Sequence, residues 1–158
     1  MNARLNPRLA APQAMKAMSD LHSYVKKCGL EHTLLELIKL RASQINGCAW
    51  CMDMHTKELR AAGEGEQRLY LLSAWRECPF YNARERAALA WTEALTKLRH
   101  DDVGDDVFEE ARAQFNEEEL VNLTMAIIAI NGANRLNIAF RAVPGDYRPR
   151  GGGEVEKR

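Results

Sequence analysis

The side chains best suited to chemistry lie together in residues 48–55, which read CAWCMDMH. Two thiols, Cys48 and Cys51, are three positions apart, and the imidazole of His55 follows four positions later. On an α-helix these spacings place the three side chains on one face. The first turn of a helix offers unpaired N–H groups and the positive end of the helix dipole, and both favour a thiolate over a thiol. The segment therefore combines a thiol that ionises readily, a second thiol that can form a disulfide with it, and a group that accepts a proton.

Either cysteine can be the reactive thiol on this evidence. Residues 46–47 are Asn-Gly, a break signal, so the helix is expected to begin near Cys48, where the dipole acts most strongly. His55, by contrast, lies one helical turn from Cys51 and is better placed to take a proton from that thiol. The residues alone leave both assignments open.

Two other interpretations use the same atoms. Free cysteine is a frequent core residue, so the two thiols and the imidazole can also be read as a buried stripe without chemistry. Alternatively, tetrahedral zinc needs four ligands, and the chain offers one oxygen, two sulfurs and one nitrogen from Glu36, Cys48, Cys51 and His55. Structural zinc sites usually take a second ligand pair from another segment, and the sequence has none, so redox chemistry is the preferred interpretation.

The role of Glu36 depends on the helix that precedes the cysteines. Residues 33–36 read TLLE, the spacing of a capping box, which would spend the carboxylate on a backbone N–H. If this helix instead packs antiparallel to the cysteine helix, Glu36 lies beside His55 and can orient the imidazole or pass protons. The spacing is equally compatible with both interpretations.

The elements that position these residues are expected to be helices throughout. Apolar side chains recur at helical spacing, no segment shows sustained alternation, and the sequence has no glycine-rich phosphate loop and no G-x-S-x-G. We expect roughly six to eight helices in a single domain over residues 1–147, with a loose arm over 1–11 and a disordered, charged tail over 148–158. The expected helices cover about residues 12–28, 33–46, 48–62, 65–76, 83–98, 107–115 and 117–140.

Composition narrows the function classes. The chain has 158 residues, 46% of them hydrophobic and 28% charged, as in an ordinary globular domain. Its 22 basic and 22 acidic residues balance, which argues against a nucleic-acid partner. Residues 125–130 are too short to span a bilayer, and residues 1–12 lack a signal-peptide apolar run, so we expect a cytoplasmic protein with no membrane partner. In a reducing cytosol a C-x-x-C pair indicates redox or metal chemistry, whereas Cys28 and Cys78 have no partner at motif spacing.

The region around the two cysteines closely resembles the core motif of the AhpD-like alkylhydroperoxidases, within the carboxymuconolactone decarboxylase superfamily. That motif runs E, R-x-S, N-x-C, C and H, and its spacings are matched here by Glu36, Arg41, Ser43, Asn46, Cys48, Cys51 and His55. The similarity extends over most of residues 12–147 and includes residues 63–64, 70–76, 84–89, 130–135 and 139–141.

This resemblance implies an all-helical protein that forms trimers or hexamers and acts as a thiol peroxidase. In the family the second cysteine attacks the peroxide and the first resolves the sulfenic acid as a disulfide. Carried over, Cys51 is the peroxidatic thiol and Cys48 the resolving thiol. Family histidine and glutamate relay the proton, which assigns that role to His55 and its partner Glu36. One position departs from the pattern: well-studied members carry a second histidine directly before the second cysteine, where this chain has Trp50.

The sequence therefore predicts an antioxidant peroxidase that reduces hydroperoxides through the Cys48–Cys51 pair. No cofactor is expected, because the sequence contains no NAD(P)H or flavin site, so electrons come from an external dithiol such as a lipoylated or thioredoxin-like reductant. The alternatives are a metal-binding or redox-sensing helical oligomer, and a dithiol–disulfide oxidoreductase without significant peroxidase activity. Lactone decarboxylation is the weaker interpretation, because that branch of the superfamily typically lacks the cysteine pair.

Overall fold

The computed structural model describes residues 2–98 and 103–149, and in these ranges the chain is helical, with no strand. The all-α prediction is thus confirmed for the described residues. Eight α-helices and one 3-10 helix follow in the order α1 (Pro7–Ala10), α2 (Pro12–Lys26), α3 (His32–Asn46), α4 (Ala49–Ala61), α5 (Glu66–Leu71), η1 (Leu72–Glu77), α6 (Ala83–Lys97), α7 (Asp105–Arg112) and α8 (Glu117–Ala139). The structure contains no helix, among the residues it describes, that has the length and apolar character to cross a membrane.

Local capping signals set the start of two long helices. The Asn82 side chain accepts from the backbone N–H of Glu85, and the Glu85 carboxylate accepts from the backbone N–H of Asn82; Asn116 and Glu119 are paired in the same way. These capping boxes open α6 and α8.

Of the two interpretations of Glu36, the capping box at residues 33–36 is the one that the structure contradicts. Helix α3 begins at His32 after Glu31, with no side-chain hydrogen bond at its cap. The carboxylate of Glu36 instead bonds to side chains, which leaves it available to the site described below.

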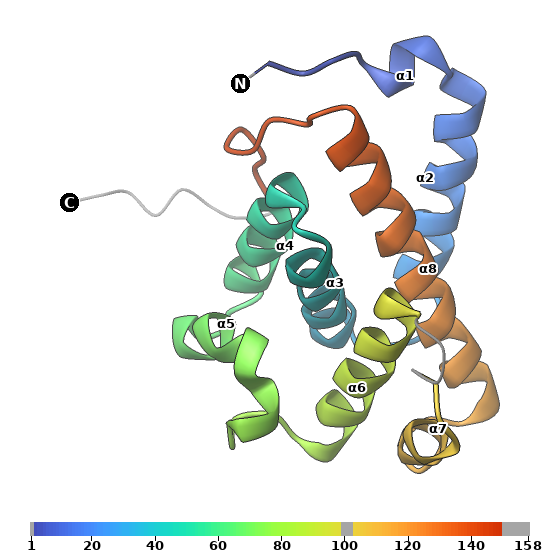
Figure 1. Cartoon of the computed structure of the whole chain (residues 1–158), viewed down its shortest axis with the longest axis vertical. Helices are drawn as coiled ribbons and strands as arrows, with labels where there is room; N and C mark the ends of the chain where they lie inside the picture. Colours follow the sequence, from blue (N-terminus) through green and yellow to red (C-terminus); the bar gives the residue numbers. More distant parts are fainter. Residues whose placement is uncertain (1, 99–102, 150–158) are drawn as a thin grey trace.

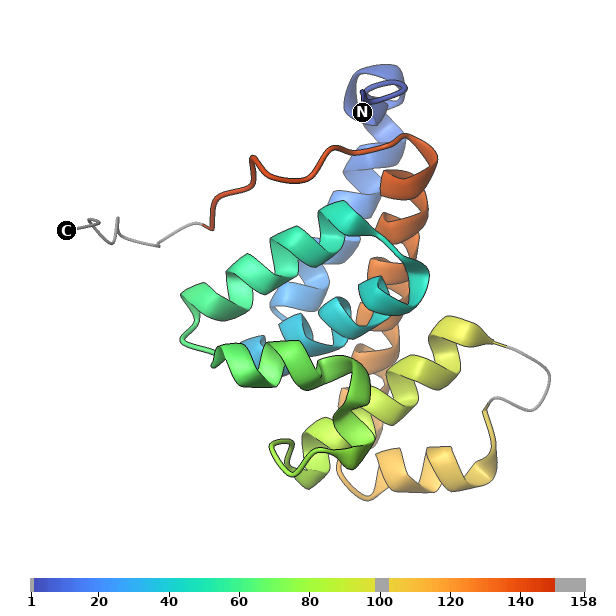
Figure 2. The ribbon, with the colours of Figure 1, turned by 60° about the vertical axis from the view of Figure 1, so that its left-hand side comes forward.

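Both chain ends of the described structure pack near the end of α8. Residues 1–11 were expected to be loose, yet Asn6 caps the short helix α1, and the backbone N–H of Arg4 donates to the carbonyl of Phe140 at 2.9 Å. After α8, residues 141–149 cross toward α4, as Figure 2 shows. Most of the predicted tail, residues 150–158, lies outside the described residues, as do residues 99–102.

Helix α3 occupies the centre of the molecule and contacts α4, α6 and α8 (Figure 1). It contributes to two apolar clusters. One joins α3 to α2, α6 and α8 and includes Leu34, Ile38, Trp91, Leu123 and Ile127. The other joins α3 to α4, α5 and η1 and includes Leu37, Leu40, Leu59, Leu72 and Trp75. Because both faces of α3 are buried, apolar residues lie nearly all round it.

Helices α2 and α8 run side by side, and a glycine lets them approach closely (Figures 1 and 2). A Cβ atom at Gly132 would lie 2.8 Å from the terminal methyl of Met18. Helix α8 continues through this glycine to Ala139. The two helices that form opposite walls of the site therefore pack closely at Gly132.

Candidate active site

A left-handed glycine turn places the two cysteines. Gly47 has φ 71° and ends α3, while the N–H groups of Gly47 and Cys48 donate to the carbonyls of Gln44 and Ser43 at 3.3 and 3.0 Å. This is a Schellman arrangement, which needs a residue tolerant of positive φ. The chain then enters α4 with Cys48 as its N-cap, and the Cys48 sulfur accepts from the N–H of Cys51 at 3.4 Å.

The cysteines form a buried disulfide in this structure. Cys48 and Cys51 are each 1% exposed, and their Cα atoms are 5.3 Å apart. The predicted pairing is therefore geometrically available without any movement of the helix start. The other two cysteines, Cys28 and Cys78, are free thiols.

Amide side chains of α8 form hydrogen bonds with the glycine turn that precedes the cysteines. The Asn46 side chain donates to the side-chain oxygens of Asn131 and Asn134, both at 2.9 Å. Asn134 in turn donates to the hydroxyl of Ser43 at 3.0 Å. Because buried amides that lose a partner are costly, this network holds the end of α3 and the cysteine turn rigidly against α8.

Two arginines whose sequence neighbours are largely apolar, Arg41 and Arg135, find partners in the structure. Arg41 pairs with the buried carboxylate of Glu93 at 2.7 Å, and Arg135 donates to the backbone carbonyl of Asn131 at 3.0 Å. Glu93 also accepts from Trp75 at 2.9 Å. This second buried carboxylate does not border the site and serves below as a matched control.

Glu36 and His55 meet as the antiparallel interpretation predicts. The Nδ1 atom of His55 lies 2.6 Å from one Glu36 oxygen, and Lys39 donates to the other at 2.8 Å. Burial opposes ionisation of Glu36, but the hydrogen bond from His55 and the charge of Lys39 outweigh it and lower the pKa to about 2. Glu36 is thus a carboxylate that only accepts, so Nδ1 of His55 is the donor.

That hydrogen bond leaves the other ring nitrogen of His55 free for chemistry. Its Nε2 atom is buried and has no hydrogen-bond partner among the described residues. With Nδ1 protonated, Nε2 of the neutral ring is an acceptor. An unpartnered acceptor in a buried position is costly, and such atoms commonly mark a place where a ligand or a proton is handled.

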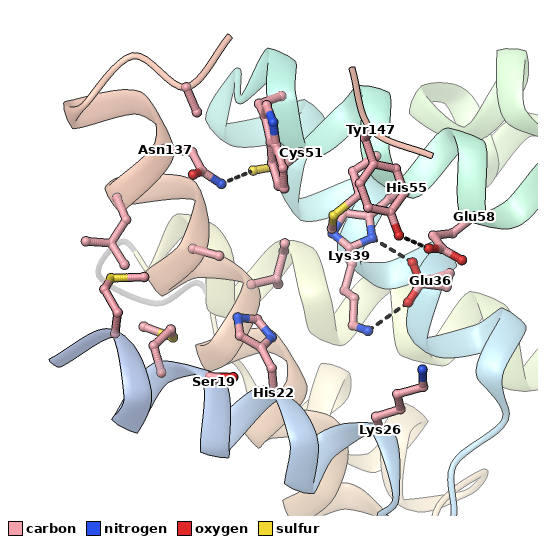
Figure 3. A pocket seen from close by; sticks show the side chains of 18 of the residues that line it. Ser19, His22, Lys26, Glu36, Lys39, Cys51, His55, Glu58, Asn137 and Tyr147 are labelled. Carbon is pink, nitrogen blue, oxygen red and sulfur yellow. Dashed lines mark hydrogen bonds and ion pairs between the residues drawn. The ribbon is translucent and has the colours of Figure 1, made fainter. Parts of the chain in front are cut away.

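A cavity of about 630 Å³ opens beside these side chains, between α2, α3, α4, α8 and the segment after α8 (Figure 3). Cys51, His55 and Glu36 all line it, whereas Cys48 does not. Trp50 forms part of the wall, and its ring meets the Tyr147 ring edge-on with centroids 6.2 Å apart. Of the two cysteines, Cys51 therefore lines the cavity and Cys48 does not.

Two cavity residues were missed by sequence reasoning. Asn137 of α8 donates from its amide to the sulfur of Cys51 at 3.3 Å. His22 enters from α2, and its pKa is lowered by burial first and then by the charges of Lys39 and His55, with Glu36 acting in the opposite direction. For Asn137 a signal existed: asparagines recur every third residue at 131, 134 and 137, on one face of α8.

The zinc interpretation gains no support from the geometry. The two sulfurs are bonded to each other, and Glu36 is held by His55 and Lys39. Within residues 2–98 and 103–149 no three or more His, Cys, Asp or Glu side chains converge as metal ligands would.

Comparison with known proteins agrees with this geometry. The sequence model of the carboxymuconolactone decarboxylase family matches residues 12–94. The uncharacterized protein YdfG of Bacillus subtilis (strain 168) is 44% identical over 140 residues, which are 89% of this chain and 95% of that protein. The chain belongs to the carboxymuconolactone decarboxylase family and, as the next comparison shows, is an AhpD-like member of it.

Two solved structures share the fold. The Agrobacterium tumefaciens protein ATU0492, of unknown function and described as a candidate antioxidant defence protein AhpD, is 49% identical with a TM-score of 0.88, covering 91% of this chain and 99% of that one. An uncharacterized peroxidase-related protein from Ralstonia eutropha JMP134, described as an alkylhydroperoxidase AhpD core, is 21% identical with a TM-score of 0.77. It aligns with 88% of this chain and 74% of its own. At that identity the second likeness concerns the fold alone.

Proposed function

We propose that this protein is a thiol peroxidase that reduces hydroperoxides with Cys51 as the attacking thiol and Cys48 as the resolving thiol. The observation that carries the proposal is that Cys51 and His55, whose Nε2 has no hydrogen-bond partner among the described residues, line one cavity that Cys48 does not line. A substrate in the cavity therefore has access to one sulfur and to one proton carrier. This geometry supports Cys51, the cysteine nearer the imidazole, as the attacking thiol.

The first half-reaction uses His55 twice. Its Nε2 takes the proton of the Cys51 thiol, and the thiolate attacks the terminal oxygen of the hydroperoxide. The O–O bond breaks, Cys51 becomes a sulfenic acid, and the proton on Nε2 passes to the departing alkoxide to give the alcohol. The ionised Glu36 stabilises the imidazolium that exists between these transfers, because it accepts from Nδ1 at 2.6 Å.

The second half-reaction closes the disulfide. The Cys48 thiol gives up its proton as its sulfur attacks the Cys51 sulfenic sulfur, the S–S bond forms, and the sulfenic hydroxide takes up that proton and leaves as water. The Cα separation of 5.3 Å lies in the range that a disulfide spans. An external dithiol then exchanges with this disulfide, becomes oxidised itself, and restores both thiols.

The test follows the thiols after one equivalent of tert-butyl hydroperoxide is added to the reduced protein. We expect the intact mass to fall by two hydrogens and peptide mapping to place the disulfide between Cys48 and Cys51. Cys48→Ser should stop at a sulfenic acid on Cys51 that dimedone captures, and Cys51→Ser should consume no peroxide rapidly. Cys78→Ser, which removes a buried thiol elsewhere, is the control. Full peroxide consumption by Cys51→Ser would show that another group attacks.

A further inference from the structure

The wall that α2 presents to the cavity changes character along the helix. Its lining residues lie at positions 15, 18, 19, 22 and 26, which is one helical face. Met15 and Met18 are apolar, whereas His22 and Lys26 are polar. From Met15 to Lys26 the helix rises roughly 16 Å. The cavity thus runs beside α2 from an apolar end to a basic end.

The remaining walls and the size of the cavity suit a long organic molecule. Leu35, Ile130 and Leu136 face it from α3 and α8. Its volume of about 630 Å³ lies in the range of roughly 300–1,000 Å³ that holds drug-sized ligands, far more than hydrogen peroxide fills. Apolar walls of this extent favour an alkyl chain over a small polar peroxide.

The charges in the wall leave a cation available. Both lining carboxylates are engaged, since Glu36 accepts from His55 and Lys39, and Glu58 accepts from the Tyr147 hydroxyl. Lys39 is consequently neutralised by its own partner. Lys26 lines the cavity and forms no hydrogen bond or ion pair with the described residues. Lys26 is an exposed residue, and Figure 3 shows it across the cavity from Cys51, on the side of Glu36 and Lys39.

We propose that Lys26 binds the carboxylate of an amphipathic organic hydroperoxide, such as an oxidised long-chain fatty acid, whose apolar chain lies along Met15 and Met18. The hydroperoxide group then lies between the Cys51 sulfur and the Nε2 atom of His55. This inference rests on the proposed peroxidase function and names its substrate class. A carboxylate bound in the cavity pairs with Lys26, which has no partner among the described residues. An alkyl chain covers the apolar part of the α2 wall, at Met15 and Met18.

The test compares a long-chain fatty-acid hydroperoxide with its methyl ester and takes the ratio of their kcat/KM values. The wild-type protein should prefer the acid, and Lys26→Gln should lower this preference about fivefold, the effect of an exposed ion pair at its upper range. Lys27→Gln is the matched control, because Lys27 follows α2 directly and does not line the cavity. It should leave the ratio unchanged.

Arg8 lines the cavity from α1, and its guanidinium has no hydrogen bond or ion pair within residues 2–98 and 103–149, so it provides the competing assignment. If Arg8→Gln lowers the preference and Lys26→Gln does not, the carboxylate binds at the other end and the assignment to Lys26 is wrong. An acid-to-ester ratio near one in the wild type would refute an anion subsite altogether.

A binding experiment separates this inference from the proposed function. Calorimetric titration of the Cys51→Ser protein with a non-oxidised fatty acid requires no peroxidase activity. Binding that weakens about fivefold in the Cys51→Ser, Lys26→Gln double variant supports the subsite even if no hydroperoxide is turned over. Conversely, turnover of tert-butyl hydroperoxide without any fatty-acid binding would uphold the peroxidase and overturn the subsite.

Discussion

Replacing Glu36 by glutamine tests whether the carboxylate controls the proton chemistry of His55. A glutamine amide can donate to Nδ1, which moves the ring proton to Nε2 and removes the acceptor that faces the cavity. Loss of a positioned general base typically costs a factor of 10² to 10⁴. We therefore expect Glu36→Gln to slow oxidation of Cys51 by tert-butyl hydroperoxide by about 100-fold at neutral pH.

The same substitution has a stability signature that can be worked out from the pKa. The folded protein lowers the pKa of Glu36 from 4.5 to about 2, which corresponds to roughly 3 kcal/mol of stabilisation of the charged form. Because the folded pKa is the lower one, this stability is present above pH 4.5 and is lost as the pH falls toward 2. Glu36→Gln should therefore lower the unfolding free energy at neutral pH and flatten its decline between these pH values.

Glu93→Gln separates the effect of a lost carboxylate on the oxidation rate from its effect on stability. Burial opposes ionisation of Glu93 as well, yet hydrogen bonds from Arg76, Trp75 and Arg41 lower its pKa to about 2, so its removal should cost similar stability. Glu93 does not line the cavity, so the oxidation rate of the folded protein should stay within twofold of the wild type, about the scatter of rate measurements on neutral variants. Stopped-flow thiol oxidation and urea unfolding, both measured against pH, give the two readouts. Equal slowing by the two variants, or an unchanged rate in folded Glu36→Gln, would refute the assigned role.

Three further predictions concern the position of Cys51 and the access of a reductant to its sulfur. Gly47→Ala forces a Cβ into the left-handed turn and should lower the unfolding free energy by about 1 kcal/mol, measured by urea unfolding. Asn137→Leu keeps the side-chain size but removes the donor to the Cys51 sulfur. It should raise the pH midpoint of iodoacetamide labelling by about one unit in Cys48→Ser protein, and an unmoved midpoint would exclude a role for this hydrogen bond. Dihydrolipoamide, a small dithiol, should reduce the buried disulfide faster than a thioredoxin of equal reducing strength.

Sequence spacing correctly predicted those features of the site that depend on a single helix. Cys48, Cys51 and His55 share the start of α4, and the Asn-Gly break before them ends α3, as the sequence indicated. The partner of Glu36 could not be decided in this way, because it depends on how two helices pack. The capping box and the imidazole were equally compatible with the spacing, and only the antiparallel contact of α3 with α4 separates them.

Residues that reach the cavity from distant helices are hard to predict from local sequence patterns. Asn137 and Cys51 are 86 positions apart, and His22 enters from a third helix. Polar residues of this kind look like ordinary surface positions in the sequence, since nothing local shows that α2 and α8 close over α4. The asparagine repeat on α8 was the one readable sign, because three amides at helical spacing on an apolar helix require buried partners.

Burial of the disulfide restricts what can reduce it, which is the reason for expecting a small dithiol to act faster. Cys48 and Cys51 are each 1% exposed, and the sulfur of Cys51 is reached through a cavity that Trp50 and Tyr147 help to enclose. Exchange requires a thiolate in line with the S–S bond, and a folded protein surface cannot place one inside such a cavity. A small dithiol such as dihydrolipoamide can enter the cavity and place a thiolate there. Faster reduction by thioredoxin would mean that the helix start opens during turnover, and that the cavity is not the route to the disulfide.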